Sequence, residues 1–144
     1  MEDTSNSVMV ALLPTTTYWC HIELPHVTLI YAGEIPDLKP TVRNDLAKQA
    51  ISIAQDFGPF TVNVTGTDVF GTTDLVDVMK LELTPELRAM RSQLEAWNGS
   101  EHTDYKPHAT IGPVGSPIEN IPSRLTFDRI VFKWGDATLI SDLF

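Results

Sequence analysis

The chain has 144 residues, a length that fits one compact domain over residues 1–144, and its 42% hydrophobic and 20% charged residues are ordinary for a globular protein. The formal net charge of −9 argues against a long polyanion as partner, because affinity for a nucleic-acid backbone comes mainly from lysine and arginine. A single cysteine, Cys20, excludes an internal disulfide, and no apolar run approaches the roughly 20 residues of a membrane span. We therefore expect a cytoplasmic protein that has no membrane contact and uses small ligands.

The pattern of apolar residues, glycines and prolines predicts strands and two helices. In chain order, we expect strands at residues 8–13 and 25–34, a helix from residue 38 or 39 to about 57, strands at 60–65, 68–70 and 75–83, a helix over about 85–98, and strands at 107–112, 125–134 and 138–143. Gly66 is expected to interrupt the third strand region.

The second helix has a clear start signal. Thr84 is predicted as the N-cap and Pro85 as the first helical residue. Its inward face would carry Leu87, Met90 or Arg91, Leu94 and Trp97.

One short sequence occurs twice, once in each half of the chain. Pro25-His26-Val27-Thr28-Leu29 is the first copy and Pro107-His108-Ala109-Thr110-Ile111 the second. Side chains alternate faces along a strand, so each histidine shares a face with the threonine two positions later. Val27, Leu29 and Tyr31 would then face the core in the first copy. Two facing histidine-threonine pairs would make an acid-base site that needs no metal.

The order of elements predicts an α+β fold. Each half has one histidine-threonine strand, a helix and partner strands. We expect two pseudo-symmetric β-sheet lobes with the helices outside and a central cleft between the two motifs.

At these residues the chain resembles the 2H phosphoesterase superfamily, which includes 2′-5′ RNA ligase-like proteins, cyclic nucleotide phosphodiesterases and compact phage enzymes that cut cyclic oligonucleotide signals. The mark of that family is two His-x-Thr/Ser motifs about half a chain apart. Flanking residues extend the resemblance over nearly the whole chain: Leu24-Pro25, residues 29–33, Val69-Phe70-Gly71 and Asp104-Tyr105-Lys106-Pro107. The short length resembles the phage-type branch.

The residue types suit the cleavage of a phosphodiester. One imidazole can take a proton from the attacking oxygen and the other can give one to the leaving oxygen, because histidine titrates near neutral pH. The hydroxyls of Thr28 and Thr110 can donate hydrogen bonds to the non-bridging phosphate oxygens. The sequence leaves open whether His26 or His108 is the acid.

Other interpretations compete with this one. His26 and His108 could be ordinary strand histidines, or the chain could be a relative that binds nucleotides without cutting them. A zinc site would have to draw on Cys20 and the four histidines, but their spacings match no common zinc pattern. His21 and His102 lie in polar loops and are expected to be solvated, and Cys20 to be a packed thiol rather than a nucleophile.

Aromatic and basic residues near the motifs are candidates for substrate binding. Tyr18, Trp19, Phe70 and Tyr105 could stack on bases, since an aromatic face accepts any base. Lys106 lies two positions before His108 and could meet a phosphate. Trp97 and Trp134 are expected in the core.

The resemblance implies a phosphodiesterase that needs no metal or other cofactor and acts on a small nucleotide. A cyclic oligonucleotide signal is the expected substrate, as in phage enzymes that silence a host cyclic-oligonucleotide (CBASS) defence. The alternatives are a 2′,3′-cyclic phosphodiesterase or 2′-5′ ligase-like enzyme acting on RNA ends, and a protein that sequesters nucleotides without cutting them.

Overall fold

The protein is seen in a computed structural model that describes residues 5–100 and 104–144. Its seven strands are β1 (Ser7–Pro14), β2 (Val27–Glu34), β3 (Phe60–Phe70), β4 (Val76–Leu81), β5 (His108–Pro113), β6 (Arg124–Trp134) and β7 (Ala137–Asp142). Its helices are α1 (Pro40–Asp56) and α2 (Pro85–Leu94), with 3₁₀ turns at η1 (Ile35–Asp37) and η2 (Glu95–Trp97). The predicted α+β class is confirmed.

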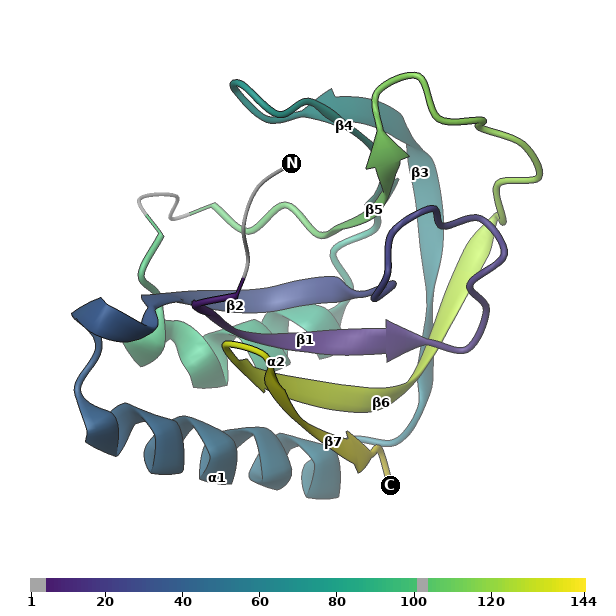
Figure 1. Ribbon diagram of the computed structural model, residues 1–144. Coiled ribbons are helices and arrows are strands. Elements are labelled where there is room, and N and C mark those ends of the chain that lie inside the picture. Colours follow the sequence, from purple (N-terminus) through teal and green to yellow (C-terminus); the bar gives the residue numbers. More distant parts are fainter. Residues whose placement is uncertain (1–4, 101–103) are drawn as a thin grey trace.

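All seven strands belong to one antiparallel sheet that curves back on itself (Figure 1). The strand order is β1-β2-β5-β4-β3-β6-β7, and β1 also pairs with β6, so the first six strands close into a ring. One lobe of the ring is β6-β1-β2 and the other is β3-β4-β5. The lobes are joined along β3 and β6 at one side and by β2 and β5 at the other.

The junction between β2 and β5 is a single residue pair, Val27 with Ala109. These are the central residues of the two repeated motifs. The sequence predicted two β-sheet lobes with a central cleft. The two lobes are parts of one continuous sheet, and this pair is where they join on the β2–β5 side.

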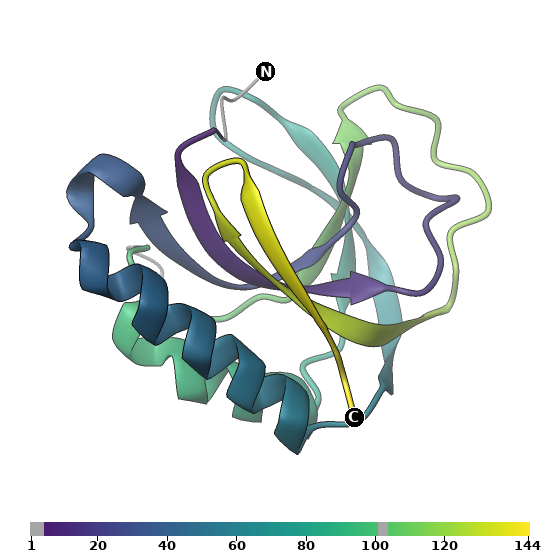
Figure 2. The same cartoon turned by 60° about the horizontal axis from the view of Figure 1, so that its bottom comes forward.

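The main core lies between the sheet and the two helices. Leu46 and Ile53 of α1 and Leu87 and Met90 of α2 are fully buried against inward-facing residues of the strands. Figure 2 shows both helices side by side along one outer side of the sheet. None of the helices in the described residues is long and apolar enough to cross a membrane.

The start of α2 is as predicted. Thr84 is the N-cap, its hydroxyl accepts a hydrogen bond from the backbone N–H of Leu87 at 3.3 Å, and Pro85 is the first helical residue. The expected break in β3 at Gly66 is wrong: the strand continues through Gly66, and only its register with β4 shifts there.

Strand β2 contains irregularities that change which side chains face the core. Its register with β1 shifts once between Val10 and Ala11 and again between Val8 and Met9, leaving extra residues in β2. Leu29 and Ile30 are therefore both buried, and the alternation reverses after them. The expectation that Tyr31 faces the core is wrong, because this reversal brings Tyr31 to the face that carries Thr28.

Candidate active site

The two motifs meet across the junction of β2 and β5. Val27 and Ala109 are paired and both fully buried, while the residues on either side of them are half-buried. Antiparallel register around this pair sets His26 towards Thr110 and Thr28 towards His108. The four motif side chains thus share the face of the ring opposite the core, in an arrangement with approximate two-fold symmetry.

Both imidazoles are held in the same way. His26 Nδ1 lies 2.6 Å from the carbonyl oxygen of Leu24, and His108 Nδ1 lies 2.8 Å from that of Lys106. A carbonyl oxygen only accepts hydrogen bonds, so each Nδ1 must carry a proton. Each Nε2 is thereby left to take or give the proton that changes place in a reaction.

A cavity of about 750 Å³ opens beside one half of this arrangement. Its volume is in the range of pockets that hold small molecules. It is lined by residues of β2, the end of β3 and the turn after it, α2, the chain before β5 and the start of β5: Thr28, Tyr31, Phe70, Gly71, Thr72, Arg91, Ser100, Asp104, Tyr105, Lys106 and His108. His108 and Thr28 therefore face the cavity directly, on one side of the motif pair.

Three of the predicted binding residues lie on this cavity. Phe70 packs edge-on against the His108 ring, with 4.7 Å between ring centroids. Tyr105 lines the wall, and its hydroxyl donates a 2.7 Å hydrogen bond to the carbonyl of Thr28. Lys106 is exposed and lines the cavity, where its positive charge balances the negative charge of Asp104 in the same lining.

Donors from outside the sheet cap backbone carbonyls along each motif strand. The donors to β5 come from the segment before β2, and the donors to β2 come from the segment before β5 and from α2. On β5, the thiol of Cys20 donates to the carbonyl of Thr110 at 3.5 Å, and the backbone N–H of His21 donates to that of Ile111 at 2.7 Å.

On β2, the corresponding carbonyls of Thr28 and Leu29 accept from the Tyr105 hydroxyl and from Arg91 Nη1, the latter at 2.6 Å. The backbone N–H of Gly99 continues this edge by donating to the carbonyl of Tyr31 at 2.9 Å. These donors take the place that hydrogen bonds from β5 would otherwise have along β2. The cavity lies where β2 and β5 separate.

The electrostatic environment distinguishes the two ends of the site. Burial lowers the pKa of His26 despite its bond to the Leu24 carbonyl, and the nearby charges of His108 and Lys133 lower it further. Burial raises the pKa of the Tyr105 hydroxyl well above its usual value, so Tyr105 stays a neutral donor. Burial also raises the pKa of Cys20, which is a packed thiol as expected.

Two of the predicted stacking residues are not on the cavity. Trp19 is only 2% exposed, packs in the main core, and donates its indole N–H to the carbonyl of Thr16 at 2.9 Å. The expectation that Trp19 stacks on a base is wrong for this structure, because the 15–26 loop folds that ring inward. Tyr18 is 62% exposed and is not among the residues that line the cavity.

Sequence reasoning missed Tyr31 and Arg91 among the cavity residues. The bulges in β2 gave no signal in the sequence, so alternation assigned Tyr31 to the core. Arg91 did leave a trace: it lies four positions after Leu87 and three before Leu94, within the buried stripe of α2. A charged residue in such a stripe indicates a specific partner or a site.

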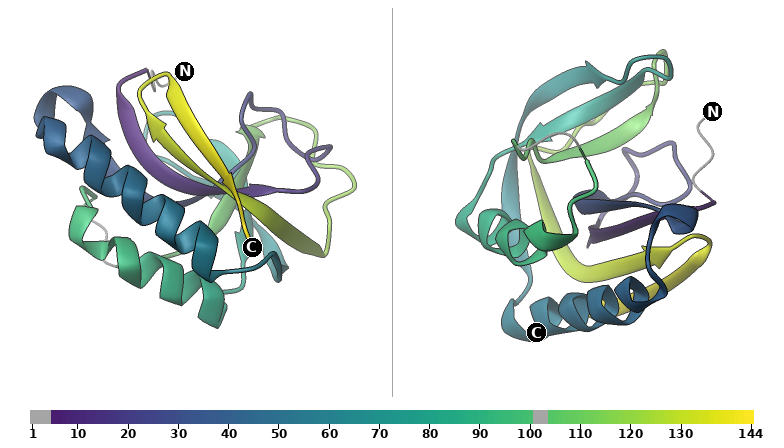
Figure 3. Two further views of the ribbon diagram at one scale, coloured as in Figure 1. Left: turned by 90° about the horizontal axis from the view of Figure 1, so that it is seen from below. Right: turned by 90° about the vertical axis from the view of Figure 1, so that its left-hand side faces the viewer.

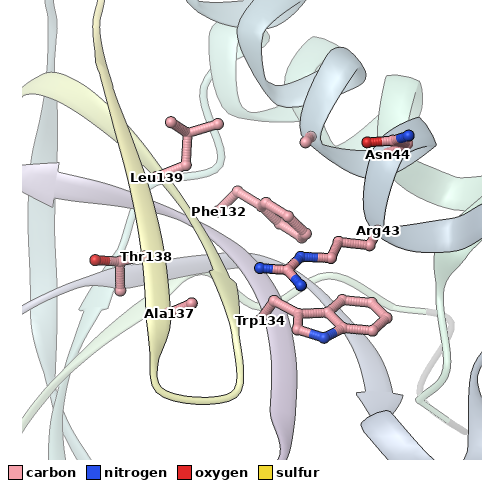
Figure 4. Close-up of a pocket in the computed structure, with 8 residues that line it drawn as sticks. Arg43, Asn44, Phe132, Trp134, Ala137, Thr138 and Leu139 are labelled. Carbon is pink, nitrogen blue, oxygen red and sulfur yellow. The ribbon is translucent and has the colours of Figure 1, made fainter. Parts of the chain in front are cut away.

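A second, smaller hollow of about 170 Å³ lies between α1 and the β6–β7 hairpin (Figure 4). The Arg43 guanidinium lies over the ring of Trp134, 5.8 Å from its centroid. Trp134 is half-buried and packs against the main core, as does Trp97. This hollow shares no residue with the cavity at the motifs.

Within residues 5–100 and 104–144, no three histidine, cysteine, aspartate or glutamate side chains gather closely enough to hold a metal ion. His21 is exposed, and its Nε2 lies 3.1 Å from the carbonyl of Pro117. His102 lies outside the described residues.

The sequence profile described as the 2′-5′ RNA ligase superfamily matches residues 21–141, which include both motifs. The chain belongs to the 2′-5′ RNA ligase superfamily. The predicted 2H phosphoesterase family is thereby confirmed, and an enzyme of the 2H type is the coarse functional assignment. No curated protein sequence is significantly similar to the chain.

Solved structures share the fold of this superfamily member at low sequence identity. Usb1 of Kluyveromyces marxianus is 9% identical, with a TM-score of 0.67, and the match covers 98% of this chain and 99% of that one. TT0787 of Thermus thermophilus is 17% identical with a TM-score of 0.56, and LigT of E. coli is 16% identical with the same TM-score. Each of these two matches covers 96% of this chain and 95% of the other.

Proposed function

We propose that the protein is a phosphodiesterase that cuts a small nucleotide with His26, Thr28, His108 and Thr110 and without a metal. The observation that carries the proposal is the Val27–Ala109 pair, because it sets both motifs on one face beside a nucleotide-sized cavity. Membership of the superfamily supports the same chemistry. Usb1 with uridine monophosphate and LigT with 3′-AMP are similarly folded proteins whose structures hold small nucleotides.

In the proposed reaction, His26 is the general base and His108 the general acid. The lowered pKa of His26 favours its neutral form near pH 7, the form that accepts a proton. His26 Nε2 takes the proton of the attacking oxygen, which bonds to phosphorus. The bond between phosphorus and the leaving oxygen breaks, and that oxygen receives the proton of His108 Nε2. When the attacking oxygen is a 2′-hydroxyl, the product is a 2′,3′-cyclic phosphate; when it is water, the product is a phosphomonoester.

Thr28 and Thr110 donate their hydroxyl hydrogens to the non-bridging phosphate oxygens. Each threonine lies across the strand junction from the opposite histidine, so the phosphorus is held between the two imidazoles. Hydrogen bonds that strengthen as charge gathers on these oxygens lower the barrier.

The proposed substrate is a small nucleotide, and a cyclic oligonucleotide signal is the first candidate. Arg91 and Lys106 give the cavity wall two positive charges against the one negative charge of Asp104, although the chain as a whole carries −9. This local positive charge supports an anionic ligand of limited size. A role in silencing a host cyclic-oligonucleotide defence rests on the resemblance to phage enzymes alone.

The test is turnover of a panel of cyclic di- and trinucleotides and 2′,3′-cyclic nucleotides in the presence of EDTA. We expect the wild-type protein to cut at least one of them with the chelator present. His26→Ala and His108→Ala should each lower kcat by roughly 10²–10⁴, the usual contribution of a general acid or base.

His21→Ala is the matched control, because the exposed His21 side chain lies outside the cavity. Full activity in either motif variant, or loss of activity with EDTA, would refute the proposed mechanism. Tight binding with intact ligand recovered afterwards would instead identify a nucleotide-sequestering protein.

A further inference from the structure

We propose that Arg91 binds a second phosphate of the substrate, on the nucleoside that occupies the cavity, apart from the phosphate held by the motifs. This inference rests on the proposed function and narrows it. The substrate class it implies is a nucleotide with phosphate on both sides of one sugar, as in a cyclic or linear oligonucleotide, and not a nucleoside with one cyclic phosphate.

The two capped strand edges provide an internal comparison. The backbone carbonyl three residues after each motif histidine accepts a hydrogen bond from a capping group. The carbonyl of Ile111 accepts from a backbone N–H, and the carbonyl of Leu29 accepts from the Arg91 guanidinium. The backbone group shows that a neutral donor is enough for this task. A guanidinium at the other edge adds a charge that capping does not require.

The charge of Arg91 is placed in the cavity wall and is costly there. The side chain is 13% exposed, and its guanidinium carbon lies 5.1 Å from the centroid of the Tyr105 ring. Removing a guanidinium from water is expensive unless its donors are satisfied. The cavity that Arg91 lines also holds His108 and Thr28, so its charge faces the same space as the motif residues of that side.

The charge of Arg91 is only partly compensated. Glu95 Oε2 lies 3.1 Å from Arg91 Nε, but Glu95 is half-exposed at 49%, and Nε is buried and makes no hydrogen bond within the described residues. An exposed carboxylate is a weak partner in water. A guanidinium has five N–H donors in a planar fork that suits phosphate, and Nη1 uses one of them on Leu29.

From the position of the cavity we infer which nucleoside of the substrate carries this second phosphate. His108, the proposed acid, faces the cavity, so the leaving oxygen belongs to the nucleoside that lies there. That nucleoside extends from the scissile phosphate past Phe70 and Tyr105 towards Arg91. Lys106 lies in the same wall and adds a second positive charge.

The experiment compares two substrates that differ only in this phosphate: adenosine 2′,3′-cyclic phosphate and the same compound with a 5′-phosphate. We expect wild-type kcat/KM to be roughly ten- to a hundredfold higher for the 5′-phosphorylated compound, as for other charge-assisted hydrogen bonds. Arg91→Met should remove this preference, and Arg91→Lys should retain only part of it, because lysine keeps the charge without the fork.

Arg88→Met is the matched control, since Arg88 lies one turn earlier on α2 and is exposed. It should keep the full preference. Equal losses on both substrates in the Arg91 variants would overturn the proposal and leave Arg91 as a cap of β2. The same conclusion follows if the wild-type protein does not discriminate between the two compounds.

A binding measurement separates this inference from the proposed function. Calorimetry with adenosine 3′,5′-bisphosphate and 3′-AMP needs no turnover. We expect the bisphosphate to bind wild-type and Arg88→Met protein about tenfold more tightly, and Arg91→Met protein no more tightly, than the monophosphate. If neither cyclic compound is cut, the hydrolytic step fails, while the bisphosphate comparison still decides the role of Arg91.

Discussion

The two motif histidines have the same local contacts and different surroundings. Each donates Nδ1–H to the carbonyl two residues before it, so the tautomers are fixed alike. Burial lowers the pKa of His26, and Lys133 of β6 adds its charge on that side. The pairing of β1 with β6 sets Lys133 opposite Met9, whose sulfur lies 3.9 Å from the Thr28 hydroxyl, so Lys133 belongs to the active face.

This environment predicts the pH dependence of the reaction. Because the pKa of His26 is lowered from 6.5, His26 stays neutral as the pH falls through 6.5, and the acid limb of kcat/KM should lie below that value. Lys133→Met removes a positive charge, raises the pKa of His26 and should move the acid limb towards higher pH. The measurement is a pH profile of kcat/KM for both proteins.

Lys48→Met provides the control, because it makes the same charge change on the exposed side of α1. Its acid limb should coincide with that of the wild type. A Lys133→Met limb that moves to lower pH, or does not move, would contradict the assignment of His26 as the base.

At the scale of elements, alternation of apolar residues and helix-start signals predicted most of the strands and both helices. Thr84 and Pro85 marked the start of α2, and the doubled motif marked β2 and β5. The strand bulges were not predictable, because an extra residue in one strand is visible only against its partner. Tyr31 was misplaced for that reason, and Trp19 because a loop sequence does not say which of its aromatics turns inward.

Gly99, just after η2, lies against the edge of β2 in a close approach of two backbones. A Cβ added to Gly99 would lie 2.2 Å from the carbonyl oxygen of Ala32, a contact that no side-chain movement relieves. Gly99→Ala must therefore push the backbone at residue 99 away from β2, the strand that carries Thr28.

We expect Gly99→Ala to lower the free energy of unfolding by about 1–3 kcal/mol, the usual cost of overpacking. It should also lower kcat/KM, because Tyr105 and Arg91 hold the strand that carries Thr28. Urea unfolding and steady-state kinetics measure the two effects. Wild-type stability in this variant would show that the backbone at Gly99 is not held closely against β2.

At the scale of the whole molecule, closure of the ring brings distant residues into one site. Figure 3 shows β1, β2 and β6 facing β3, β4 and β5 across the ring, with the helices outside. The repeat in the sequence predicted two lobes, each with one motif, and a central cleft. It did not predict that β3 and β6 also pair, because the alternation within a strand does not specify which strand lies beside it.

The charge of the whole molecule predicts how binding depends on salt. The chain has ten lysines and arginines against 19 aspartates and glutamates, and two of the basic residues line the cavity. A ligand that meets about two phosphate-binding groups should lose less than about tenfold in affinity between 50 and 200 mM salt, whereas six to ten phosphate contacts would cost about 10³–10⁵. We therefore expect a shallow salt dependence of KM for a small nucleotide.

An unstructured RNA of about 20 nucleotides should compete only weakly with that nucleotide over the same salt range, because the acidic surface outside the cavity repels the rest of its backbone. The measurement is inhibition of nucleotide turnover by the RNA at each salt concentration. Strong inhibition at 50 mM that falls steeply with salt would mean that a basic track beyond Arg91 and Lys106 engages the backbone. That result would favour RNA ends over a small nucleotide as the substrate of the same two histidines.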